Sequence, residues 1–164
     1  MDKKLRKQLK SLGSKRTQYP KRPHKSILEV FDAPAPTSAA DGKFFYVRFD
    51  QDGEFTSLCP VTGQPDFANI RLVYQPSKLC VESKSLKLYL ASFRNYPGFG
   101  EKITNRIADD LFAVMKPMWI AVVGEFRSRG GISWTTTALR VVPSHDLNIM
   151  DVEQVSLISQ RRLP

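Results

Sequence analysis

The stretch EFTSLCPVTGQPDF, residues 54–67, contains the turn around which the predicted fold is organised. An apolar run ends at Cys59, a turn rich in proline and glycine follows, and Asp66 opens a second apolar run. Because proline fixes its own φ angle, residues 60–65 predict a loop of fixed shape. Such a loop can hold a nucleophilic thiolate and a proton-donating carboxyl beside one small molecule. The alternative is a buried structural cysteine beside a capping aspartate.

On either side of this loop, hydrophobic patterns predict strands, then two helices, then strands again. The predicted strands are residues 27–31, 43–49, 67–74, 119–126 and 132–142, and the predicted helices are residues 83–95 and 101–116. Residues 50–53 (DQDG) and 128–131 (SRGG) have the composition of turns. This order predicts an α+β domain, in which an antiparallel sheet carries two helices on one face.

The positive charge of the chain is concentrated at its start. Residues 1–26 hold ten Lys and Arg and one acidic residue, and so carry the whole formal net charge of +9. We expect a disordered basic tail at residues 1–26, one folded domain at residues 27–143 and an irregular C-terminal tail at residues 144–164. The alternative for the basic tail is a contact with nucleic acid or another polyanion.

Composition excludes several classes of protein. No run approaches the ~18 apolar residues of a membrane span, and the first residues lack the apolar region of a signal peptide. The expected location is therefore the cytoplasm. The two cysteines make neither a disulfide framework nor a zinc site, so no metal is predicted. The two histidines, His24 and His145, are expected at the surface.

A second stretch, VESKSLKLY at residues 81–89, lies where a strand passes into a helix. We expect Ser83 to be the N-cap of that helix. The free N–H groups of a helix N-terminus favour an anion, and Lys84 and Lys87 add two cations one turn apart. The alternative is a capped helix with a solvated lysine face.

Five separated motifs resemble those of the 7-cyano-7-deazaguanine reductases, the nitrile reductases of queuosine biosynthesis in tRNA modification. The motifs are FTSLCP (55–60) with TGQPDF (62–67), ESKSLKLY (82–89), FRN (93–95), Glu101 and RGGI (129–132). The resemblance implies a tunnelling fold, whose subunits assemble into a multimeric barrel with active sites between subunits. It also implies a homo-oligomer that acts on a small molecule, with no membrane and no stable nucleic-acid partner for the folded domain.

The same resemblance implies a role for each site residue. Cys59 attacks the nitrile carbon of 7-cyano-7-deazaguanine to form a thioimidate, Asp66 supplies the proton, and two NADPH complete the reduction to the aminomethyl group. The implied substrate-binding residues are Val81, Glu82, Ser83, Gly100 and Glu101, and the implied cofactor-binding residues are Lys84, Lys87 and Arg129. A carboxylate such as Glu101 suits a guanine-type edge, because it accepts two adjacent donors.

One position departs from the family pattern. Gly100 stands where the family usually has a histidine, so the role of that histidine must be absent or taken by another group. This departure slightly favours a second reading, a reductase-like amidinotransferase that acts on the same nitrile in tRNA; the intact 82–89 segment opposes it. A third reading is a non-catalytic purine- or pterin-binding scaffold, which the presence of both Cys59 and Asp66 opposes. Cys80 is either a buried strand residue or the partner of Cys59 in a protective disulfide.

Overall fold

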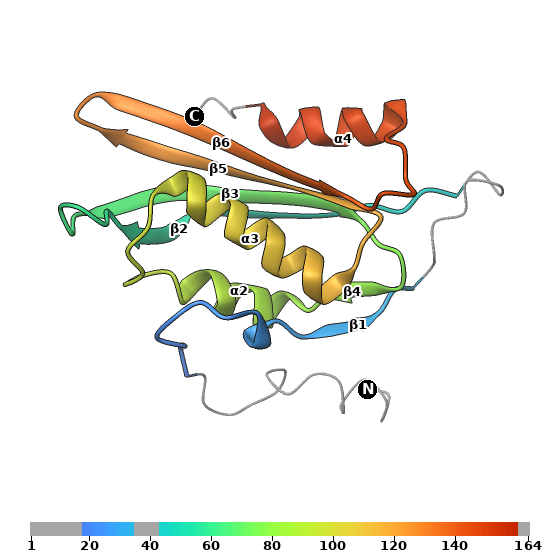
Figure 1. The fold of residues 1–164 in the computed structure, drawn as a ribbon, viewed down its shortest axis with the longest axis horizontal. Helices are drawn as coiled ribbons and strands as arrows, with labels where there is room; N and C mark the ends of the chain where they lie inside the picture. Colours follow the sequence, from blue (N-terminus) through green and yellow to red (C-terminus); the bar gives the residue numbers. More distant parts are fainter. Residues whose placement is uncertain (1–17, 35–42, 161–164) are drawn as a thin grey trace.

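The computed structural model describes residues 18–34 and 43–160 (Figure 1). The elements in chain order are η1 (Lys25–Ile27), β1 (Val30–Asp32), β2 (Val47–Leu58), β3 (Pro65–Gln75), β4 (Leu79–Val81), α2 (Ser83–Ala91), α3 (Gly100–Met115), β5 (Trp119–Arg129), β6 (Ile132–Val141) and α4 (Ile149–Ser159). The predicted order of strands, two helices and strands is confirmed.

The main sheet is antiparallel, with the strand order β2-β3-β5-β6. Strands β1 and β4 form a separate two-stranded antiparallel sheet. The predicted turn at residues 50–53 lies within β2, where the pairing with β3 shifts register between Gln51 and Phe55. Gly53 has a φ of +76° there and its N–H donates to Asn69 Oδ1 at 2.7 Å, so the segment is a bulge and not a chain reversal.

Helices α2 and α3 pack against one face of the main sheet and enclose the larger core (Figure 1). On α3 the apolar stripe is Ile103, Ile107 and Leu111, and all three are buried. The helix ends at Met115 and is capped by Lys116, whose φ of 49° is left-handed, directly before Pro117. The architecture is thus the expected α+β domain with two helices on one face of the sheet.

The opposite face of the sheet is covered by a third helix, where we expected an irregular tail. Helix α4 lies along this face (Figure 1), and Ile158 packs there with Val73, Trp119, Ala121 and Val123. The helix begins with a capping box, in which Asn148 and Asp151 each bind the backbone N–H of the other. The second face of the main sheet is therefore covered by a helix of the same chain.

The N-terminal boundary of the folded body also differs from the prediction. Residues 1–17 lie outside the described residues, but residues 18–26 are described. Pro23 is buried and its carbonyl accepts a hydrogen bond from Arg106 Nη2 at 2.7 Å. The domain therefore begins before residue 27. Within the described part of the chain, no helix is long and apolar enough to cross a membrane.

Candidate active site

Cys59 lies at the first position of the loop between β2 and β3. Its N–H donates to the carbonyl of Gln64 at 2.8 Å, and its carbonyl accepts from the N–H of Gly63 at 2.9 Å. Gly63 has a φ of +68°, a conformation that glycine adopts without strain. These bonds close the loop on itself, so the predicted loop of fixed shape is present.

The environment of the Cys59 thiol favours the thiolate. Hydrogen bonds from the Thr62 side chain, then from the backbone N–H groups of Thr62 and Val61, lower the pKa of Cys59 to about 7, with a smaller contribution from Arg129. Burial opposes this shift, since the residue is 5% exposed. A thiol with this pKa is about half ionised near neutral pH. A lowered pKa is expected of a nucleophilic cysteine, whereas burial in apolar surroundings would raise the pKa of an inert core cysteine.

Asp66 is the second residue of β3, just after this loop. It pairs with Ser57 in the β2–β3 ladder, two residues before Cys59, and is 7% exposed. Arg129 reaches it from the end of β5, with 2.7 Å between Nη1 and Asp66 Oδ1. The thiol and the carboxyl that the sequence predicted thus lie at one end of the sheet, and Arg129, predicted to bind the cofactor, lies with them.

The segment just before α3 is attached to the last residue of β2, next to Cys59. The N–H of Leu58 donates to the carbonyl of Tyr96 at 3.0 Å, and the N–H of Gly98 donates to the carbonyl of Leu58 at 3.0 Å. These bonds bring Gly100 and Glu101, the first two residues of α3, to the same end of the molecule. Gly100 is buried and Glu101 is exposed.

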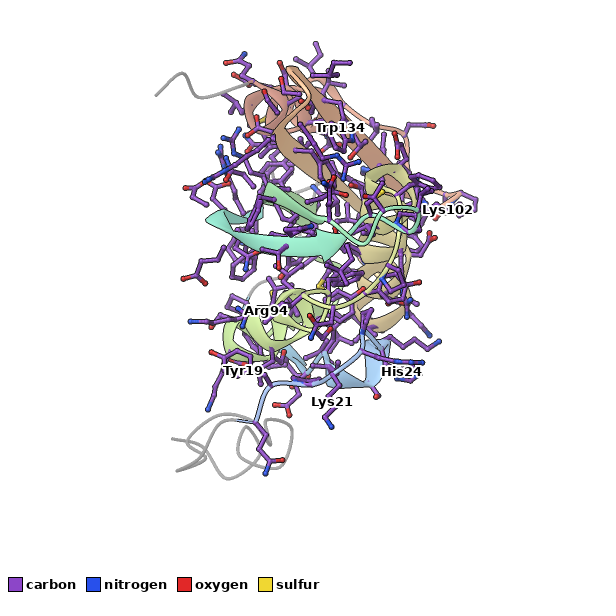
Figure 2. The ribbon with its side chains drawn as sticks, turned by 90° about the vertical axis from the view of Figure 1, so that its left-hand side faces the viewer. Tyr19, Lys21, His24, Arg94, Lys102 and Trp134 are labelled. Carbon is purple, nitrogen blue, oxygen red and sulfur yellow. The ribbon has the colours of Figure 1, made fainter. Side chains whose placement is uncertain are left out.

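The space beside Gly100 is filled by an aromatic ring. A β-carbon at position 100 would lie 2.6 Å from Cζ of Phe126. Phe126 is buried on β5 and stacks on Trp134 of β6, with ring centroids 4.9 Å apart and an interplanar angle of 3°. Figure 2 labels Trp134 over β6. No side chain fits at position 100 unless Phe126 moves.

The second predicted group of site residues lies where β4 passes into α2. The N-cap of α2 is Glu82 and not Ser83 as predicted: the buried Glu82 carboxylate accepts from the N–H groups of Lys84 at 2.8 Å and Ser85 at 2.7 Å. The helix N-terminus that we expected to bind an external anion is therefore occupied by a side chain of the protein itself.

These two groups are far apart in one chain. The N–H of Val81 donates to the hydroxyl of Tyr74 at 3.1 Å, which places the second group at the far end of β3 from Asp66. Tyr74 and Asp66 are eight residues apart on this strand, a distance of about 26 Å at ~3.3 Å per residue. Figure 1 shows the β2–β3 turn and β4 at opposite ends of the molecule. One chain does not bring all the predicted site residues together.

Comparison with known proteins identifies relatives of this chain. The family model described as "QueF-like protein" matches residues 65–143. A curated relative from Anaeromyxobacter sp. (strain K), called NADPH-dependent 7-cyano-7-deazaguanine reductase, is 54% identical over 111 residues, which is 68% of this chain and 86% of the relative. A relative of the same name from Streptococcus thermophilus (strain ATCC BAA-491 / LMD-9) is 50% identical over 127 residues, 77% of this chain and 74% of the relative.

The chain belongs to the 7-cyano-7-deazaguanine reductase family. A solved structure, the archaeosine synthase QueF-Like in the apo form, has a TM-score of 0.53 at 19% identity, over 57% of this chain and 91% of that one. At this identity the likeness concerns the fold alone, and it supports the tunnelling fold. The family model ends at residue 143, before α4 begins, so this reductase-family chain carries a helix beyond the matched segment.

The disulfide proposed between Cys59 and Cys80 is not compatible with this fold. Both cysteines are free and buried. Cys80 lies on β4, and burial raises the pKa of its thiol, an effect that a hydrogen bond with Tyr74 reduces. Cys59 lies at the opposite end of β3, whereas a disulfide requires Cα atoms within roughly 7 Å. Cys80 is therefore a structural strand residue of this subunit.

The two histidines differ from each other. His24 is exposed on the N-terminal segment (Figure 2), where its ring accepts from the N–H of Ser26. His145 was also expected at the surface, but it is 14% exposed and its Nε2 lies 3.2 Å from Oδ2 of the buried Asp151. This contact connects the loop after β6 to the first turn of α4.

Two residues close to Cys59 in the chain were not predicted as site residues. Thr62 supplies the largest hydrogen-bond contribution to the lowered pKa of Cys59. Its place three residues after a cysteine in a tight loop was the available signal. Ser57 is fully buried, and its hydroxyl has no hydrogen-bond partner among the described residues. Nothing in the sequence distinguishes this serine from an ordinary strand residue.

Proposed function

We propose that the chain catalyses the NADPH-dependent reduction of 7-cyano-7-deazaguanine, which converts the nitrile to an aminomethyl group in queuosine biosynthesis. The names of the relatives support this substrate and NADPH. The observation that carries the proposal is the Cys59 thiol, whose pKa of about 7 is set by a closed loop at the end of the sheet that also holds the Asp66 carboxyl.

In the first step the Asp66 carboxylate takes the proton of the Cys59 thiol, the thiolate attacks the nitrile carbon, and Asp66 passes that proton to the nitrile nitrogen. A carbon–sulfur bond forms, one carbon–nitrogen π bond breaks, and the product is a thioimidate that retains every atom of the substrate. The negative charge passes from sulfur to the Asp66 carboxylate, whose Oδ1 lies 2.7 Å from Arg129 Nη1. A cation already in place where charge develops lowers the barrier without reorganisation.

When bound, NADPH would supply hydride. Two hydrides and two protons from water would take the thioimidate to the aminomethyl product and release the Cys59 thiol, with two NADP⁺ formed. Lys84 and Lys87 would hold the phosphates of NADPH through their side chains, because Glu82 occupies the N–H groups at the start of α2. A cavity of about 210 Å³ lies between α2 and strands β2 and β3, lined by Ser83 and Lys87 among others. It is smaller than the roughly 300 Å³ of the smallest usual ligand pockets, so we place NADPH on a surface completed by another subunit.

The substrate base would lie between Glu101 of one subunit and the Val81–Ser83 segment of another. Glu101 is exposed on the first turn of α3, so its two oxygens can accept the adjacent N–H donors of a guanine-type edge. Gly100 would contribute its backbone only. Asp66 lies at the start of β3, whereas Val81, on β4, lies beside Tyr74 near the other end of β3. A complete site therefore requires a second copy of the chain, as in a barrel assembly.

A mixing experiment tests this assembly. Cys59→Ala and the double variant Lys84→Ala/Lys87→Ala should each be inactive alone, because each homo-oligomer lacks one half of every site. Mixed and reassembled from unfolded subunits, they should regain a fraction of the wild-type activity. Reassembled mixtures that stay inactive, although wild-type protein reassembled in the same way is active, would contradict a site between subunits.

The reaction itself is tested by following NADPH oxidation with 7-cyano-7-deazaguanine as substrate. The proposal predicts two NADPH oxidised per nitrile consumed and an aminomethyl product. Consumption of the nitrile without NADPH oxidation would contradict it, and would point to the amidinotransferase reading with ammonia and tRNA.

A further inference from the structure

Arg129 is placed to act on the reacting groups. It ends β5 and pairs across the Gly130–Gly131 turn with Ile132. Both glycines have positive φ, +61° and +84°, so the turn is tight. The β5–β6 register shifts between Phe126 and Arg129, a bulge that changes the direction of the side chains that follow it.

The Arg129 side chain is partly buried against the site. It is 41% exposed, yet Nη1 lies 2.7 Å from Oδ1 of Asp66, which is itself 7% exposed. Among the described residues, Arg129 is thus the ion-pair partner of the Asp66 carboxylate. The same guanidinium also contributes to the lowered pKa of Cys59. One cation thus pairs with Asp66 and favours the Cys59 thiolate.

We propose that Arg129 is a positioning residue for Cys59 and Asp66, which holds the carboxylate beside the sulfur and stabilises the thiolate. This inference rests on the proposed function only for the roles of Cys59 and Asp66. It differs from the cofactor-binding role that the family resemblance implied for Arg129. A guanidinium has five N–H donors in a fixed planar arrangement, so Nη1 can bind Asp66 while the other nitrogens stay open to solvent.

The charge balance of the site supports this role. Asp66 is almost fully buried, and a buried carboxylate without a compensating cation is costly. Neutralising Arg129 leaves that carboxylate unpaired beside a thiol that ionises near neutral pH. The substitution therefore disfavours the thiolate in two ways: it removes a hydrogen-bond donor, and it leaves the negative charge of Asp66 uncompensated nearby.

The test is the rate of Cys59 alkylation by iodoacetamide as a function of pH, measured without substrate or cofactor. Peptide mapping separates Cys59 from Cys80. For Arg129→Gln we expect the midpoint of the profile to move up by about one pH unit, which lowers the rate at pH 7 about fivefold. Arg129→Lys keeps a cation and should restore part of this loss. Arg127→Gln, an exposed arginine two residues earlier on the same strand, is the matched control and should match wild type.

Two outcomes separate the alternatives. If Arg129 serves the cofactor alone, Arg129→Gln will leave the alkylation profile unchanged and raise only the KM for NADPH, and the inference is then overturned. Since Arg129→Lys should also fold like wild type, a profile identical to that of Arg129→Gln would show that charge at this position does not act on the thiol. Because alkylation uses neither nitrile nor NADPH, the test holds even if the proposed reductase activity fails.

Discussion

The contact between Gly100 and Phe126 makes a quantitative prediction about the start of α3. In Gly100→Ala the new β-carbon would lie 2.6 Å from Cζ and 2.7 Å from Cε2 of Phe126, a separation that requires the ring to move. Phe126 is buried and stacked on Trp134, so moving it disturbs the larger core. Overpacking of this kind costs about 1–3 kcal/mol of the free energy of unfolding.

A second effect opposes this cost. Alanine is the better helix former, and replacing glycine within a helix gains up to about 1 kcal/mol. At the first residue of α3 the gain should be smaller, so we expect Gly100→Ala to lower the free energy of unfolding by about 1 kcal/mol or more. In a Phe126→Leu background the ring is gone, and the same substitution should be neutral or stabilising.

The assay is urea unfolding of wild type, both single variants and the double variant at one protomer concentration, since assembly changes apparent stability. The four free energies form a double-mutant cycle, and we expect a coupling of about 1–2 kcal/mol between positions 100 and 126. Additive effects within about 0.5 kcal/mol would refute the claim that the Phe126 ring fills the space beside Gly100.

Three further predictions follow from single contacts. Thr62→Val removes the hydroxyl that lowers the pKa of Cys59 most, so the midpoint of the thiol alkylation profile should move above pH 7; an unchanged profile would contradict that role. Glu82→Ala removes the N-cap of α2 and should lower the free energy of unfolding by about 1 kcal/mol, measured by urea unfolding, while Cys59 alkylation at the far end of the sheet stays constant. Burial raises the pKa of Asp151, but hydrogen bonds from the Asn148 backbone, Tyr46 and His145 outweigh burial and lower that pKa below its ordinary value. The stability that Asp151 contributes should therefore be present at neutral pH and lost as the pH falls through its folded-state pKa, and Asp151→Asn should unfold with a weaker dependence on acid pH than wild type.

The order of strands and helices could be predicted because hydrophobic periodicity reports it directly. Two of the errors in the fold have clear physical causes. The sequence DQDG suits both a turn and a bulge, and only the pairing of β2 with β3 decides for the bulge. Helix α4 is apolar on more than one side, with Ile149 88% exposed and Ile158 buried, so it lacks the stripe by which an amphipathic helix is recognised. Its capping pair, Asn148 and Asp151, was the available signal.

The site was predictable where it depends on local sequence. Cys59 and Asp66 flank one hairpin loop, so their proximity follows from the turn. The contact of Arg129 with Asp66 depends on the register of β5 and on a bulge near its end, neither of which sequence patterns specify. The N-cap was misassigned because serine is the usual capping residue, whereas the Glu82 carboxylate reaches two N–H groups of the first turn.

The proposed mechanism requires Cys59 to be the nucleophile that binds the nitrile carbon. The most direct measurement is the intact mass of the protein mixed with 7-cyano-7-deazaguanine in the absence of NADPH, for wild type and for Cys59→Ala. We expect a gain of one whole substrate molecule per chain in wild type, located on Cys59 by peptide mapping and reversed when NADPH is added, and no gain in Cys59→Ala. An equal gain in both proteins, or none in wild type while NADPH is still oxidised, would contradict that mechanism.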